Sequence, residues 1–246
     1  YSSAASDVYK RQGHTLTKVV DDFVKDYKAE DAEFVTYQPL SDADMEKLEQ
    51  EYDVILEHSR YKDVNVESGD LKGATIRVFP MPEKLNLCEV RDGHEPGDGE
   101  ALLTQDFADM HDIRVGDTIS LGAYDYKVSA YTTKADYIYM LDKLSGYIDS
   151  EKFALVVVDR KEYDKIDADE TSYYSIKYNK DNSNEVREKL NEDYVIASYM
   201  AATTNTRISM PVNEGDAVTN MATMYAPVMF IIIITLVVMV LGRNIR

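Results

Sequence analysis

An uncharged, strongly apolar segment near the C-terminus constrains this chain more than any other feature. Residues 217–242 carry no charged side chain, and residues 225–241 read YAPVMFIIIITLVVMVL. A helix of about 20 residues spans the ~30 Å hydrocarbon core of a bilayer. A helix of a soluble domain keeps a polar stripe, which this segment lacks on every face. We therefore predict a stalk and transmembrane helix over residues 211–246, with the helix in the membrane over about 222–242.

The charges on either side of this segment predict its orientation. Glu214 and Asp216 precede it, and Arg243 and Arg246 follow it. Because basic residues are retained on the cytoplasmic side, we expect a cytoplasmic C-terminus and an extracytoplasmic body. We also expect the helix to start near residues 212–216 and to run unbroken into the membrane.

The body of the chain is acidic. The 246 residues include 45 acidic and 27 basic side chains, which gives a formal net charge of -18. Such a surface repels nucleic acid and is typical of a well-solvated domain. Cys88 is the only cysteine. An intrachain disulfide is therefore excluded, and we expect Cys88 to be a small buried residue.

The N-terminal residues do not read as part of a fold. Residues 2–12, SSAASDVYKRQ, resemble a translated sequencing adapter and show no hydrophobic period. We therefore treat residues 1–12 as a non-native segment and exclude them from the fold prediction. We expect the native sequence to begin near Gly13, with its own N-terminus missing.

Hydrophobic periodicity predicts an α+β body. Apolar residues at helical spacing predict a helix over 15–28, and Ser41 with Asp44 resembles a capping box that opens a helix ending near Tyr52. Short apolar or alternating runs predict strands at 33–38, 54–56, 74–79, 87–90, 101–103, 118–121, 126–131 and 137–141, with a helix at 105–110. Gly116 is expected to need a positive φ in its turn, and Asp117 to accept from a neighbouring backbone N–H.

The last part of the body alternates strands and helices more regularly. Strands are predicted at 153–158, 173–178 and 195–199, and helices at 160–166 and from Asn182, as the cap, to about 192. The continuous apolar run 153–158 indicates a strand buried on both faces. We therefore predict a two-lobed extracytoplasmic domain of mixed sheets and short helices, with lobe 1 over 13–141 and a βαβαβ-like lobe 2 over 142–210.

No catalytic, cofactor-binding or metal-binding residue is predicted. The four histidines, His14, His58, His94 and His111, include no pair at the spacing of a helical zinc site. Residues 92–100 lack the alternating ligands of a calcium loop and read as a turn. Neither GxxxxGK nor GxGxxG occurs. Asp167, Asp169 and Glu170 cluster without an apolar setting, so solvated charge explains them better than catalysis.

Four segments together resemble the FtsX-like, or MacB/LolC-type, family of ABC transporter permeases. They are GEALLTQDFADMHDIRVGDTISL, YDYKVSAYTTKADYIYM, PVNEGDAVTNMATMYAPVMF and GRNIR, which lie at 99–121, 124–140, 211–230 and 242–246. The resemblance in layout covers 13–246, while the specific motif is confined to about 100–139.

The resemblance implies a multi-pass membrane protein that works with other subunits. A first membrane helix would precede the extracytoplasmic domain, with 15–28 as its outward extension, and further helices would follow residue 246. The implied partners are a separate cytoplasmic ABC ATPase, a second permease copy and the lipid bilayer. ATP-driven closure inside the cell would move the outer domains to export, extract or sense a substrate. The family supplies no catalytic residues or cofactors to carry over.

Two alternatives stay open. The first is a membrane-anchored extracellular binding protein with no transport role. The second is a membrane-tethered hydrolase, which requires two acidic side chains that converge in a pocket.

Overall fold

The computed structural model describes residue 15 and residues 17–121, 123–144 and 146–211. They divide into two compact units, and the larger one, Val24–Ile208, is called the domain below. In the described part of the chain, no helix is long and apolar enough to cross a membrane. The predicted membrane helix over 222–242 lies outside the described residues.

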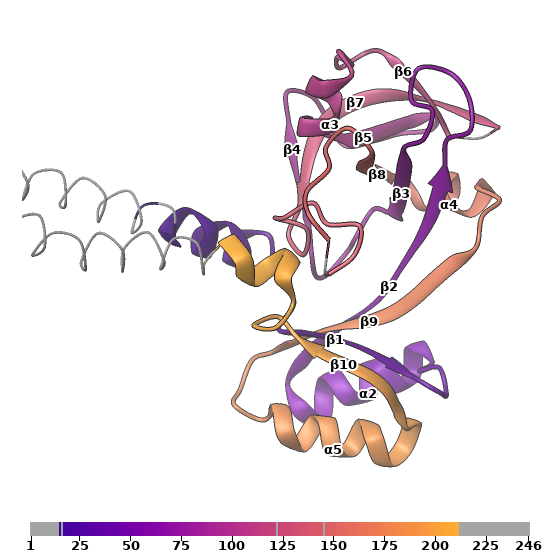
Figure 1. Cartoon of the computed structure of the whole chain (residues 1–246). Coiled ribbons are helices and arrows are strands. Elements are labelled where there is room, and N and C mark those ends of the chain that lie inside the picture. The colour runs from indigo at the N-terminus through magenta and orange to yellow at the C-terminus, as the bar shows by residue number, and fades with distance from the viewer. Residues whose placement is uncertain (1–14, 16, 122, 145, 212–246) are drawn as a thin grey trace, which may run out of the picture. The chain divides into compact units, whose positions relative to one another are not determined.

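The domain is α+β, as predicted, with one mixed ten-stranded sheet and short helices (Figure 1). Its elements follow one another as β1 (Ala32–Thr36), α2 (Asp42–Tyr52), β2 (Val54–Asn65), β3 (Thr75–Pro80), β4 (Cys88–Arg91), β5 (Glu100–Thr104), α3 (Gln105–Met110), β6 (Thr118–Leu121), β7 (Tyr124–Lys134), β8 (Phe153–Val158), α4 (Arg160–Lys165), β9 (Glu170–Tyr178), α5 (Ser183–Tyr194) and β10 (Ile196–Ala201).

Two further helical segments are described. Residues 17–26 are helical, within the range that the periodicity predicts. Residues 206–211 are also helical. The helix predicted to start near residues 212–216 lies outside the described residues.

One end of the sheet is a split β-α-β unit. The strands β10, β1, β9 and β2 lie in that order, and every neighbouring pair is antiparallel. Helix α2 connects β1 to β2, and α5 connects β9 to β10. Leu48 of α2 and Leu190 of α5 share one core with Phe34 of β1, so both helices cover the same face. The unit thus has the order β-α-β-β-α-β, with β3 to β8 inserted between β2 and β9.

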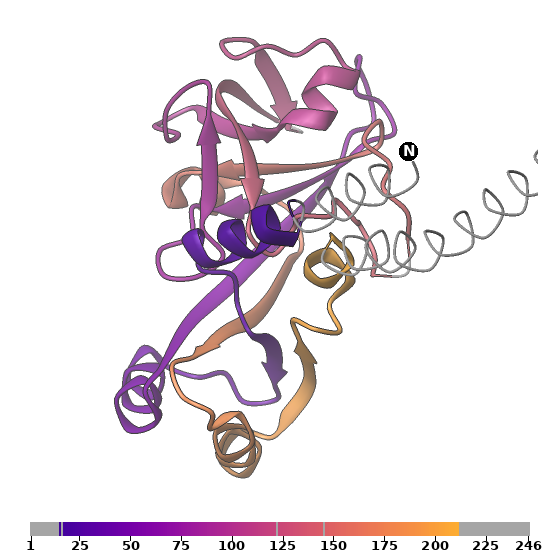
Figure 2. The ribbon, with the colours of Figure 1, turned by 90° about the vertical axis from the view of Figure 1, so that its left-hand side faces the viewer.

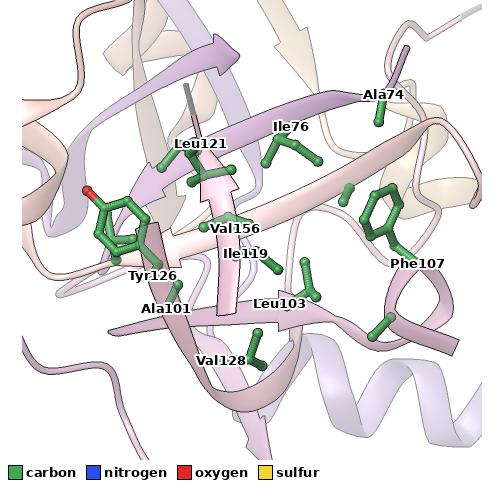
Figure 3. Close-up of a cluster of buried hydrophobic side chains, with 14 of the residues drawn as sticks. Ala74, Ile76, Ala101, Leu103, Phe107, Ile119, Leu121, Tyr126, Val128 and Val156 are labelled. Atoms are coloured by element: carbon green, nitrogen blue, oxygen red, sulfur yellow. The ribbon is translucent and has the colours of Figure 1, made fainter. Parts of the chain in front are cut away.

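Strand β8 is the centre of the inserted part. It lies between β3, to which it is parallel, and β5, to which it is antiparallel, and all six of its residues are buried. Val156 packs with Phe107 of α3 in a core on one face (Figure 3). Leu155 packs with Phe79 of β3 in a second core on the other face. The prediction of a strand buried on both faces is confirmed, and each such side chain contributes roughly 1.5–3 kcal/mol on burial.

The strand order groups the chain differently from the predicted boundary between 13–141 and 142–210. Strand β8 lies between β3 and β5, and β9 lies between β1 and β2. Strands after residue 142 therefore fill positions between strands that precede it. They do so because backbone N–H and C=O groups of a buried strand need partners on both sides.

Several local predictions are confirmed and others are wrong. The capping box of Ser41 and Asp44 is present, and Gly116 has a φ of 100°. The backbone N–H of Arg114 donates to the Asp117 carboxylate at 2.8 Å. Residues 137–141 form no strand. Asn182 does precede α5, but its side-chain amide donates to the Tyr52 carbonyl at 2.6 Å instead of capping the helix.

The loop before β5 provides a test of this packing. A Cβ added at Gly93 would lie 1.9 Å from the backbone oxygen of Ser129, whereas one at Gly97 would meet only the Glu100 carboxylate at 3.4 Å. We expect Gly93→Ala to destabilise the domain by several times as much as Gly97→Ala, since overpacking against backbone costs roughly 1–3 kcal/mol or more. Urea unfolding of the two variants measures the difference. Equal midpoints would contradict this packing.

Candidate functional site

The chain enters and leaves the sheet at the same point. Ala32, the first residue of β1, pairs with Ala201, the last residue of β10 (Figure 1). The backbone N–H of Ala202 then donates to the carbonyl of Asp31 at 2.8 Å. The segments that lead into and out of the domain therefore adjoin the same pair of strands.

The entry segment is held by side chains from distant parts of the sequence. The backbone N–H of Glu30 donates to Asn86 Oδ1 at 2.9 Å, and the N–H of Asn86 donates to the Lys28 carbonyl at 2.9 Å. Lys177 of β9 donates from Nζ to the Ala29 carbonyl at 2.8 Å. The buried Asn86 amide also donates to Glu30 Oε2 at 2.8 Å. These bonds fix the path of the chain into β1.

The exit segment is held mainly by Arg207. Its guanidinium donates to Glu33 Oε2 of β1 at 2.9 Å and to the hydroxyl of Tyr137. Asn205 Oδ1 accepts from the backbone N–H and from Nε of Arg207, both at 3.2 Å. The backbone N–H of Tyr139 donates to the Arg207 carbonyl at 2.9 Å. Arg207 thus connects the first turn of helix 206–211 to the sheet.

Tyr137 joins this exit contact to the inserted strands. Its hydroxyl also accepts from the guanidinium of Arg77 in β3 at 2.8 Å. Arg77 donates from Nε and a terminal nitrogen to the two oxygens of Asp63, each at 2.8 Å, which is a bidentate ion pair. Arg207 also lies 4.4 Å from the centre of the Tyr137 ring, a cation–π distance. One fully buried phenol therefore receives hydrogen bonds from two guanidinium groups.

A second buried ion pair lies close by in sequence. Lys134 Nζ, at the end of β7, is 2.6 Å from Asp136 Oδ1, and both side chains are buried. The hydroxyl of Tyr173 donates to the other Asp136 oxygen at 3.4 Å. Lys134 Nζ also lies 4.7 Å from the centre of the Phe79 ring. Removing either charge would leave the other buried without compensation, which is strongly destabilising.

These residues form one group, which we call the anchor network. Its members are Glu30, Glu33, Asp63, Arg77, Asn86, Lys134, Asp136, Tyr137, Tyr173, Asn205 and Arg207.

Burial raises the pKa of two carboxyl groups in the anchor network, Glu30 and Glu33, and the shift is larger for Glu30. Burial, followed by repulsion from Asp136 and Glu33, raises the pKa of Glu30 to about 8. Hydrogen bonds from Ser175 and Asn86 to its carboxylate oppose this shift. Glu30 Oε1 has no hydrogen-bond partner, which suits a protonated carboxyl better than a buried anion. With Glu30 neutral, the three remaining acidic residues of the network balance its three basic ones.

The arrangement suits anchoring better than catalysis. Glu30 and Asp136 converge, as a carboxylate-based hydrolase requires, but their exposed fractions are 2% and 0%. A general acid or base must come within hydrogen-bond reach of its substrate. Among the described residues, no group of three or more His, Cys, Asp or Glu side chains is placed to hold a metal ion.

The residues considered as candidate sites in the sequence lie outside the anchor network. His58, His94 and His111 are dispersed, and His14 lies outside the described residues. Residues 92–99 lie in the loop that leads from β4 to β5, as expected, and Glu100 begins β5. Asp167 and Asp169 are exposed, as is Glu170 at the start of β9. Cys88 is buried, and burial raises its pKa to about 12, in keeping with an unreactive thiol.

Sequence reasoning missed the anchor network because its members are far apart along the chain. One signal was available. Arg77 interrupts the apolar run of β3, and Lys134 and Asp136 flank an alanine at the end of a strand. Charged residues inside apolar strands are rarely buried unless they are paired. The pairing partners, however, follow only from the strand order.

Comparison with known proteins leaves the family open. No family model matches the chain, and no curated protein matches it. Among solved structures, a crystal structure described as a "putative lipoprotein" from Bacillus anthracis aligns with a TM-score of 0.31 and 10% sequence identity. The alignment covers 69% of this chain and 96% of that one.

Glu30 makes the stability of the domain depend on pH. Its pKa is about 8 in the folded domain and 4.5 as a free side chain, so folding takes up a proton between these values. Stability is therefore fully present below about pH 4.5 and is lost as the pH rises toward 8, by up to ~1.4 kcal/mol per pH unit. We expect Glu30→Gln to make this slope clearly shallower in urea unfolding of the full chain in detergent micelles, with the remainder coming from Glu33, whose pKa burial also raises.

A matched control isolates the effect. Glu188→Gln, on the exposed side of α5, should keep the wild-type slope. Burial lowers the pKa of His58, which acts on stability with the opposite sign, but His58 is present in every variant and cancels. A Glu30→Gln variant with the wild-type slope would show that Glu30 is not the titrating group.

Proposed function

We propose that this chain is part of an FtsX-like ABC transporter permease, with residues 13–216 outside the cytoplasm and a membrane helix over about 222–242. Its extracytoplasmic domain would transmit ATP-driven motion in order to export, extract or sense a substrate. The proposed partners are a separate cytoplasmic ABC ATPase, a second permease copy and the lipid bilayer. The apolar segment 225–241 and the arginines after it support the membrane assignment.

The observation that carries the transmission role is the anchor network. Motion can pass from a membrane helix into a domain only if the connecting segment is fixed to that domain. Arg207 fixes the exit segment to β1 through Glu33 and to β3 through Tyr137 and Arg77. These contacts reach both the split β-α-β unit and the inserted strands. A displacement of the exit segment would therefore move both groups of strands. These two groups of strands take the place of the lobes predicted at 13–141 and 142–210, because β8 belongs to the inserted strands and β9 to the split β-α-β unit.

The alternative is a membrane-anchored extracellular binding protein with no transport role. A pocket of about 490 Å³ beside β2 is the observation that favours it. Such a protein needs a ligand site and an anchor, but it does not need a buried ionic connection at the exit segment. For this reason we place the permease first.

Cysteine labelling tests the orientation. The native Cys88 is buried, so background labelling should be low. We expect a membrane-impermeant maleimide to label Asp169→Cys in intact bacterial cells and to label Arg246→Cys only after permeabilisation. Labelling of Arg246→Cys in intact cells, or recovery of the chain in the soluble fraction, would contradict the membrane assignment.

Spin labels test the transmission. In a permease dimer reconstituted with its ATPase, labels at Asp169→Cys should report an ATP-dependent change in the distance between the two domains. Arg207→Gln should abolish that change, because it removes the ion pair to Glu33 and the bond to Tyr137. Arg187→Gln, an exposed arginine of α5 that lies over the Tyr199 ring, is the matched control and should keep it. Unchanged motion in Arg207→Gln would remove the anchor network from the mechanism.

A further inference from the structure

Strand β2 has a hydrogen-bonding edge that the domain leaves open. It pairs with β9 from Val54 to Lys62, but it pairs with β3 only from Lys62 to Asn65. Over residues 54–61, β2 therefore has a neighbouring strand, β9, on one side only. Figure 2 shows β2 as a long strand that extends well beyond its partner β3 toward α2.

The direction of the backbone groups identifies which residues are open. The N–H of Leu56 donates to Glu49 Oε1 at 2.8 Å, so it points away from β9. Backbone groups alternate along a strand, so those of His58 and Arg60 point to the same side as Leu56. At Lys62 the same side meets β3. His58 and Arg60 thus present their N–H and C=O groups to the gap.

Two prolines explain why β3 does not close this edge. The register pairs Lys62 with Val78, and its continuation would place Pro80 opposite Arg60 and Pro82 opposite His58. Proline has no N–H, so neither position can form the full pair of ladder bonds. The chain turns instead toward β8. There the N–H of Met81 donates to the Val158 carbonyl at 2.9 Å.

Glu57 then holds the following loop away from the strand. Its carboxylate accepts from the backbone N–H groups of Glu83, Lys84 and Leu85 at 2.8, 2.8 and 2.6 Å. The loop is thereby fixed to β2 through a side chain rather than through a backbone ladder. The space that remains is the pocket of about 490 Å³, which we call the β2 groove. Its size lies within the usual range of ligand sites.

The charges around the β2 groove favour a basic occupant. Three of its cations already have acidic partners in the domain. Lys84 pairs with Glu49, Arg160 with Glu83, and Arg60 with Asp164 and Glu170.

Two acidic residues on α2 remain available. Asp42 and Glu46 are one helical turn apart and line the groove. Neither makes an ion pair among the described residues. The lining also includes Met45 and Met81, which are partly exposed and offer apolar contacts.

We propose that the β2 groove binds an extended, basic segment of a partner protein, which adds to β2 as a strand. An open strand edge is the surface that β-augmentation requires, since its backbone groups give affinity and the flanking side chains give selectivity. The bound segment would pair with His58 and Arg60 and would place its basic side chains beside Asp42 and Glu46. This inference is independent of the permease assignment, because it rests only on the domain.

Binding of a defined peptide tests the proposal. The probe is a fluorescent, end-blocked heptapeptide that alternates valine and lysine, and the protein is the full chain in detergent micelles. We expect Asp42→Asn combined with Glu46→Gln to weaken binding by about tenfold, as the loss of two partly exposed ion pairs implies. Asp167→Asn combined with Asp169→Asn, an equal charge change on an exposed loop, should leave binding unchanged. If both double substitutions weakened binding equally, binding would depend on the net charge of the protein and not on Asp42 and Glu46.

Backbone methylation tests the strand geometry. Alternate residues of an added strand face β2, so methylating the valine nitrogens and methylating the lysine nitrogens should have opposite effects. One of the two peptides should lose binding and the other should keep it. If both bind, or if neither does, the segment is not added as a strand.

Amide hydrogen exchange locates the contact. The peptide should slow exchange at His58 and Arg60, whose N–H groups face the groove. Exchange at Ser59, whose N–H faces β9, should not change. Protection that appears elsewhere, with none at His58 and Arg60, would overturn the proposed site.

Discussion

The rest of the domain depends on the hydrogen bonds that the hydroxyl of Tyr137 accepts. It accepts from Arg77 and from Arg207, and each arginine has its own carboxylate, Asp63 or Glu33. Two guanidinium groups can approach one buried phenol only because these carboxylates neutralise them. Loss of the phenol would therefore leave the paired charges in place but remove the bond between β3 and the exit segment. The buried polar groups specify an arrangement that apolar packing alone would leave loose.

The topology makes this interaction possible. In the split β-α-β unit the first and last strands are neighbours, so the chain enters and leaves at one place. The insertion between β2 and β9 is joined to that unit along the sheet, and it contributes the segment that carries Lys134, Asp136 and Tyr137. Residues separated by more than a hundred positions in the sequence thereby meet. Such non-local contacts carry a large loop-closure cost, which buried ion pairs and the β8 cores must offset.

The sequence predicts the individual helices and strands far better than it predicts which strands lie side by side in the sheet. Strand β8 and helix α3 match the predicted bounds, because an unbroken apolar run and a short periodic segment leave little choice. Strand β2 was underestimated because Glu57, Arg60 and Lys62 break its apolar pattern. Each of them is satisfied by a partner that lies far away in the sequence. The anchor network was missed for the same reason. Whether a charged side chain is buried depends on the order of the strands, and local periodicity does not determine that order.

The β2 groove and the anchor network share Lys134. This residue lines the groove, and its ammonium group pairs with Asp136, the immediate neighbour of Tyr137 in the chain. A segment bound beside β2 would therefore lie next to the buried side chain that balances the charge of the network. If one arrangement of the network leaves Lys134 better placed for that segment, binding must favour this arrangement, and the exit segment must in turn influence the affinity. Because Pro80 and Pro82 keep β3 from closing this edge, the β2 groove extends as far as the buried Lys134.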